Sequence, residues 1–114
     1  MKLYSSLSAF VEYANRQEHL LPLLPPSEKA ICFQFKEECC SLHLSHEGMF
    51  VSKDKCGTDK VILKEEQNLE QLISGEVRLQ LLLRRKGAEY SGTYRSLLLL
   101  ESLFHICKPL DLGA

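Results

Sequence analysis

Residues 30–52 read AICFQFKEECCSLHLSHEGMFVS, a stretch in which two kinds of side chain alternate along the chain. Alternation with a period of two is typical of β-strands, because successive side chains point to opposite faces of a sheet. Ile31, Phe33 and Phe35 form one apolar row of β-branched and aromatic residues, the types that strands favour. Ala30 to Lys36 is therefore predicted to be a strand.

The chain continues in the same way beyond this strand. Apolar and other side chains alternate again over residues 39–44, which predicts a second strand, and Glu47-Gly48 then marks a turn into a third strand at Met49–Ser52. The polar residues from Asp54 to Asp59 indicate another turn. Val61 to Leu63 is predicted to be a short fourth strand.

The segment before the strands has helical periodicity instead. Its apolar residues follow one another at spacings of four, three, one and three positions, which is one face of a helix; they are Leu3, Leu7, Phe10, Val11 and Ala14. Pro22, Pro25 and Pro26 end this pattern, because proline lacks a backbone donor and pushes the residue before it toward extended geometry. The prolines are predicted to lie in a linker.

The C-terminal half begins with a short predicted helix that starts at Gln67-Asn68 and ends at Ser74-Gly75, with glycine in the left-handed cap conformation. The residues from Val77 to Leu83 fit a strand and a helix equally well, so periodicity leaves both open. Ala88 to Tyr94 is predicted to be a strand, and Arg95 to Ile106 a closing helix.

The closing helix is apolar around most of its circumference. Its polar positions are only Arg95, Ser96, Glu101, Ser102 and His105. A helix of this kind is either buried on several sides or places one face against something other than its own core. The sequence therefore predicts that a ligand or another protein surface covers part of this helix.

The overall composition is that of an ordinary soluble domain. The chain has 114 residues, of which 45% are hydrophobic and 25% charged, with a formal net charge of -1. This length is typical of one domain, expected over residues 1–114. A near-neutral chain lacks the basic surface that phosphate backbones require, so a nucleic-acid partner is not expected.

The cysteine content and the apolar runs bear on the compartment. Five cysteines without a recognisable secretory signal at the start predict reduced thiols and a cytoplasmic location. No apolar run approaches the length of a membrane span, and the densest is Leu97 to Leu100. The chain is not expected to cross a bilayer.

Cys39, Cys40, His43 and His46 are the candidate metal ligands. On a strand, residues four apart are about 13 Å apart at ~3.3 Å per residue, whereas ligands of one zinc ion lie within about 4 Å of each other. Cys39 and His43 could then share an ion only if the segment were not a strand. The prediction is that the chain holds no metal.

Thiol and imidazole side chains are the candidate catalytic groups of this chain. A thiol enzyme could pair Cys32, Cys56 or Cys107 with His19 or His105, or use Cys39-Cys40, but no spacing selects a pair. The chain has no nucleophile elbow, Walker loop or dinucleotide fingerprint, so no enzyme activity and no cofactor is expected.

The only basic run is Arg84-Arg85-Lys86, with Arg95 close in sequence. It is either a solvated helix end or a docking point for an acidic head group, and the first interpretation is favoured.

Three segments of the C-terminal half resemble the sterol carrier protein type 2 family: Leu69-Glu70-Gln71-Leu72-Ile73-Ser74-Gly75, then Tyr90-Ser91-Gly92-Thr93-Tyr94, then Leu97 to Leu100 with Leu103-Phe104. About the last 50 residues match well, and the first 60 or so match only in the order of elements. One departure is that residues 76–82 lack the proline and the Ala-Phe pair that family members often carry after the glycine. The resemblance implies an α/β (α+β) fold with a mostly antiparallel five-stranded sheet covered by helices, a hydrophobic cavity, and helix over Val77 to Arg84.

The resemblance also implies non-catalytic binding of fatty acyl chains, sterols or similar lipids between the sheet and the last helix. The residues expected to line this site are Phe33, Phe35, Leu44, Leu97, Leu100, Leu103 and Phe104. An empty pocket of about 300 to 1,000 Å³ would cost roughly 7 to 24 kcal/mol, against a total stability of ~5 to 15 kcal/mol. The pocket is therefore expected to be small, partly collapsed or occupied.

The alternative to lipid binding is a protein interaction module or homodimer that uses the closing helix.

Overall fold

The computed structural model describes residues 2–17, 22, 24–53 and 59–106. Within these residues it has a mixed α+β fold of five strands and four helices. The strands are β1 (Lys29–Phe35), β2 (Glu38–Ser45), β3 (Gly48–Ser52), β4 (Asp59–Leu63) and β5 (Ala88–Ser91). The helices are α1 (Lys2–Ala14), α2 (Glu66–Ile73), α3 (Leu79–Arg84) and α4 (Tyr94–Ile106).

The strands form one sheet in the order β3-β2-β1-β4-β5. Three of its four pairings are antiparallel, and only β1 and β4 run parallel. Parallel strands cannot be joined by a tight turn, and here the hairpin of β2 and β3 lies between β1 and β4 in the chain. The expected mostly antiparallel five-stranded sheet is confirmed.

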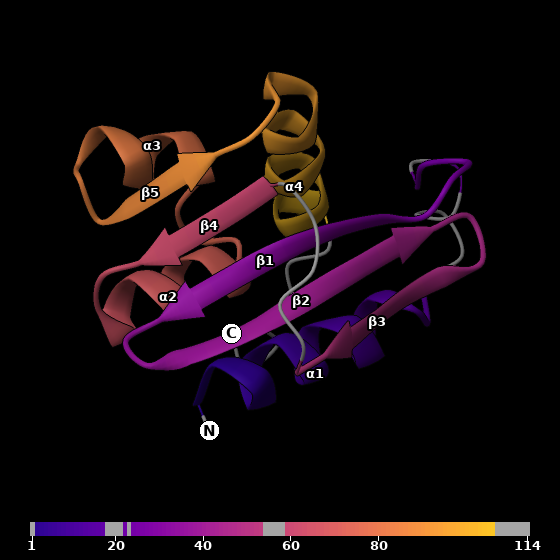
Figure 1. Cartoon of the computed structure of the whole chain (residues 1–114), viewed down its shortest axis with the longest axis horizontal. Helices are drawn as coiled ribbons and strands as arrows, with labels where there is room; N and C mark the ends of the chain where they lie inside the picture. The colour runs from indigo at the N-terminus through magenta and orange to yellow at the C-terminus, as the bar shows by residue number, and fades with distance from the viewer. Residues whose placement is uncertain (1, 18–21, 23, 54–58, 107–114) are drawn as a thin grey trace.

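The helices lie behind the strands in the view of Figure 1. Helix α1 packs across β2 and β3, α2 packs on β4, and α3 packs on β5. The row predicted to be apolar on β1 faces these helices, and Ile31, Phe33 and Phe35 are all buried. The core therefore lies between this face of the sheet and the helices.

The opposite face of the sheet carries a polar cluster around His43. The imidazole of His43 is 8% exposed; its Nδ1 lies 3.0 Å from Glu28 Oε2 and its Nε2 lies 2.9 Å from Ser52 Oγ. The ring of Phe50 stacks on it with centroids 4.3 Å apart. Both nitrogens of this buried ring thus have partners, as buried polar groups require.

Two strand ends differ from the prediction. The strand predicted over Ala88 to Tyr94 ends at Ser91, because Gly92 adopts a φ of +148° and the next residue caps a helix. Thr93 Oγ1 accepts a hydrogen bond from the backbone N–H of Ser96, as helix-capping residues do. Lys36, predicted to be in the first strand, adopts a φ of +55° and belongs to the turn after β1.

The closing helix differs from the prediction at its start, which is Tyr94 rather than Arg95, and at Ser96. Ser96 is one of its predicted polar positions, but its side chain is fully buried and accepts a hydrogen bond from Thr93 Oγ1 at 2.9 Å. The apolar excess of this helix remains in part on the surface, where Leu98 and Ile106 are 39% and 46% exposed.

The ambiguous segment from Val77 to Leu83 and the predicted turn of residues 54–59 have separate outcomes. Residues 79–84 form helix α3, which starts two residues later than the Val77 implied by the resemblance. In the predicted turn of residues 54–59, only Asp59 is described, and it is buried at the start of β4. The rest of that turn lies outside the described residues.

Candidate functional site

An apolar pocket lies between α1 and α2. Its volume is about 380 Å³, and it is lined by Ser6, Ala9, Phe10 and Tyr13 of α1 together with Glu70, Ile73 and Ser74 at α2. The α1 residues are spaced at three, one and three positions, so they form one stripe along the helix. The small side chains of Ser6 and Ala9 leave space between the two helices.

The local sequence of α2 places its half of the pocket. The backbone N–H of Glu65 donates to the Asn68 side chain at 3.1 Å and so holds the start of the helix. Ser74 caps the other end, and Gly75 follows with a φ of +77°. The predicted end of this helix at Ser74-Gly75, with glycine in the left-handed conformation, is confirmed.

An ion pair joins the same two helices. Lys2 Nζ lies 3.3 Å from Glu70 Oε1, and both side chains are about half exposed. Such an exposed pair contributes about 0 to 1 kcal/mol to stability. The ion pair matters for the pocket because Glu70 also lines it and is the one formally charged group among the lining residues.

Phe10 connects this pocket to the core. Its ring lies 4.6 Å, centroid to centroid, from the ring of Phe104 on α4. The Phe104 ring in turn meets Phe33 of β1 edge to face at 6.2 Å. A row of three aromatic rings thus runs from the lining of the pocket, at Phe10, to the sheet, at Phe33.

The structure brings all seven predicted site residues into one buried core. Each is at most 8% exposed, and none is among the residues that line the pocket between α1 and α2; the seven are Phe33, Phe35, Leu44, Leu97, Leu100, Leu103 and Phe104. Two of them, Phe33 and Phe104, belong to the aromatic row below the pocket. Their contact with a ligand stays a prediction.

Sequence reasoning missed most of the residues that line the pocket. Phe10 is predicted only as an apolar position of its helix, and Glu70, Ile73 and Ser74 appear only in the short predicted helix and in the segment that carries the family resemblance. The sequence feature that could have indicated the pocket is the pair of small residues Ser6 and Ala9 next to the buried apolar stripe of α1. That signal becomes informative only when the neighbouring helix is known, because a small exposed residue by itself has no consequence.

The other candidates form no site within the described residues. Cys39 and Cys40 point to opposite faces of β2, and no group of three or more His, Cys, Asp or Glu there could hold a metal ion. His19, Cys56 and Cys107 lie outside the described residues. Arg84 is in the last turn of α3, and the basic run of residues 84–86 is exposed and does not line the pocket of α1 and α2.

No family model matches the sequence, and no curated protein does. Solved structures match the fold. A protein described as "UbiJ-SCP2 Ubiquinone synthesis protein" is 16% identical with a TM-score of 0.70, and the match covers 91% of this chain and 89% of that one. The sterol carrier protein domain 2 of Helicoverpa armigera has a TM-score of 0.67 at 11% identity, with 94% of this chain and 88% of that one covered.

The chain has the sterol carrier protein 2 (SCP2) fold. A crystal structure of sterol carrier protein 2 agrees, with a TM-score of 0.63 at 13% identity over 92% of this chain and 95% of that one. At such identities the likeness concerns the fold, which can carry different functions. No helix among the described residues is long and apolar enough to span a membrane.

Proposed function

We propose that this chain binds an apolar lipid, an acyl chain, a sterol or a similar molecule, without altering it chemically. The observation that carries the proposal is the apolar pocket of about 380 Å³ between α1 and α2 in a chain with the SCP2 fold. Its volume lies in the range of about 300 to 1,000 Å³ that is usual for small-molecule sites. The whole chain, residues 1–114, would act as one such domain.

The ligand would enter between α1 and α2 and reach toward the core through Phe10. A change in the Phe10 rotamer would connect the pocket to Phe104, because the Phe10 ring lines the pocket and contacts the Phe104 ring. The apolar end of the ligand would then meet the seven residues predicted from the sequence. Each methylene buried in this way contributes about 0.8 kcal/mol, which offsets part of the cost of ordering the ligand.

The polar lining favours a neutral head group. The pocket offers the hydroxyl groups of Ser6 and Ser74 and the carboxylate of Glu70. A carboxylate accepts hydrogen bonds from a hydroxyl but repels another carboxylate. A sterol, whose hydroxyl donates to such a carboxylate, should therefore bind more tightly than a free fatty acid at neutral pH.

Binding can be tested with cholesterol, ubiquinone and palmitate. Native mass spectrometry and thermal unfolding of the full chain should show an adduct and a raised melting temperature, since a ligand that binds only the folded state stabilises it. Ala9→Trp fills the pocket and should abolish both effects. Ser5→Trp places the same ring on α1 at an exposed position that does not line the pocket, so it should leave binding intact.

Two outcomes would contradict the proposal. One is that the wild-type chain binds none of the three lipids. The other is that Ala9→Trp binds them as tightly as Ser5→Trp does, which would remove the ligand from this pocket.

The alternative is an interaction module or homodimer that uses α4. The exposed side chains of Leu98 and Ile106 on that helix favour it. Light scattering after size exclusion separates the alternatives, because self-association through α4 requires twice the mass of one chain.

A further inference from the structure

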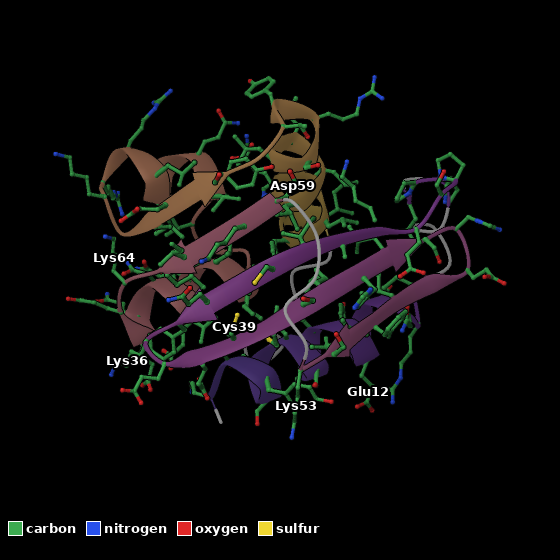
Figure 2. All side chains as sticks on the ribbon, viewed as in Figure 1. Glu12, Lys36, Cys39, Lys53, Asp59 and Lys64 are labelled. Carbon is green, nitrogen blue, oxygen red and sulfur yellow. The ribbon has the colours of Figure 1, made fainter. Side chains whose placement is uncertain are left out.

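Two thiols meet on the sheet face opposite the helices. The Sγ atoms of Cys32 on β1 and Cys39 on β2 are 3.3 Å apart. Cys32 is paired with Ser41 and Cys39 with Gln34 across the two strands, so the cysteines are diagonal neighbours on one face. Figure 2 labels Cys39 on β2, close to the turn that joins it to β1.

The two thiols differ in their access to solvent. Cys39 is partly exposed next to the turn after β1, whereas Cys32 is 6% exposed. Small polar oxidants therefore reach Cys39 first. Cys32 lies directly behind it, within the distance that a second step requires.

Cys40 provides an internal contrast. Its side chain is on the other face of β2, fully buried in the core. Burial raises the pKa of the Cys40 thiol to about 12, so it remains protonated at neutral pH and a poor nucleophile. Adjacent cysteines in the sequence thus have opposite chemical settings.

We propose that Cys32 and Cys39 form a reversible disulfide when the chain encounters a peroxide. In the first step the Cys39 thiolate attacks a peroxide oxygen and the O–O bond breaks. Cys39 becomes a sulfenic acid, and the departing hydroxide takes up a proton and leaves as water. In the second step the sulfur of the Cys32 thiol attacks Cys39 Sγ; the S–S bond forms and the S–O bond breaks, and the sulfenic hydroxyl leaves as water with the proton that the Cys32 thiol gives up. Two thiols together lose two electrons, which the hydrogen peroxide accepts.

The position of the pair makes the bond reversible. Diagonal neighbours in an antiparallel sheet have Cα atoms about 7 to 8 Å apart, whereas disulfides favour roughly 4.4 to 6.8 Å. The bridge therefore requires a local movement of the backbone at the two cysteines. A dithiol reductant opens such a bridge readily, because strained disulfides are the labile ones.

Tryptic mapping tests the proposal on the full chain. Cleavage after Lys29, Lys36 and Lys53 places Cys32 in peptide 30–36 and Cys39 with Cys40 in peptide 37–53. After treatment with hydrogen peroxide, quenching in acid and alkylation, these two peptides should be joined. The chain should lose two of its five thiols, and dithiothreitol should restore both.

Two variants assign the bridge. Cys39→Ser should abolish the joined peptides, and Cys40→Ala should retain them. If Cys40→Ala fails to fold, fragmentation of the joined wild-type peptides between residues 39 and 40 makes the same assignment. A joined pair that persists in Cys39→Ser, a bridge from Cys32 to any other cysteine, or no bridge at all would overturn the proposal.

Discussion

At the scale of single residues, the turn before α4 depends on Gly92. Asp59 at the start of β4 accepts a hydrogen bond from the Thr93 backbone N–H at 3.0 Å. The Tyr90 hydroxyl donates to the Thr93 carbonyl at 2.7 Å; burial and the nearby Asp59 carboxylate raise the pKa of Tyr90, so it keeps the proton it donates. Both side chains crowd the glycine.

Gly92→Ala should lower the free energy of unfolding by about 2 kcal/mol or more, because the residue keeps a positive φ and a new methyl group must be accommodated. Its Cβ would lie 2.1 Å from Asp59 Oδ1 and 2.8 Å from the Tyr90 hydroxyl. Urea denaturation measures the change. Ser91→Ala, at the neighbouring exposed position, should leave the midpoint almost unchanged, and equal midpoints for the two variants would contradict this account of the turn.

At the scale of elements, the end of α1 is joined to the edge strand of the sheet. The Asn15 side chain accepts a hydrogen bond from the Met49 N–H at 3.0 Å and donates one to the Met49 carbonyl at 2.9 Å. It thus bonds to the backbone of β3, which has only β2 as a strand neighbour. This interaction holds α1, and with it one wall of the pocket, against the sheet.

Asn15→Ala should destabilise the chain by about 1 to 3 kcal/mol, since two hydrogen bonds are lost and each contributes ~0.5 to 1.5 kcal/mol. Hydrogen exchange at the Met49 amide should become faster at the same time. The matched control is Arg16→Ala, which removes only an exposed pair with Glu12 and should cost less than about 0.5 kcal/mol. An unchanged exchange rate at Met49 in Asn15→Ala would show that the contact does not hold β3.

At the scale of the whole molecule, the Phe104 ring connects three elements, α1, β1 and α4. It packs on Phe10 of α1 and on Phe33 of β1 while belonging to α4. Segments from the start, the middle and the end of the described chain therefore meet at one ring. The residue is 2% exposed.

Phe104→Ala should lower the free energy of unfolding by about 3 to 5 kcal/mol, the usual cost of removing a buried aromatic ring. Leu98→Ala on the same helix is the control, because Leu98 is 39% exposed and should cost under about 1 kcal/mol. Calorimetric melting of the two variants checks the difference. Similar melting temperatures would mean that the ring is not packed as described.

The sequence by itself determined the elements whose signal is local. The apolar row of β1 and the stripe of α1 follow from their periods of two and 3.6 residues, and Gly75 ends α2 because glycine adopts positive φ without a steric cost. The resemblance in the C-terminal half predicted the mostly antiparallel sheet, which the pairings confirm.

Only the tertiary structure decided features that depend on distant neighbours. Residues 79–84 form a helix although their period fits a strand as well, and Ser96 is buried although it is one of the predicted polar positions of the closing helix. The pocket beside Ser6 and Ala9 exists because α2 packs next to α1. The physical reason is the same in each case: packing between segments far apart in the chain sets burial and space, and a local pattern does not encode which segments meet.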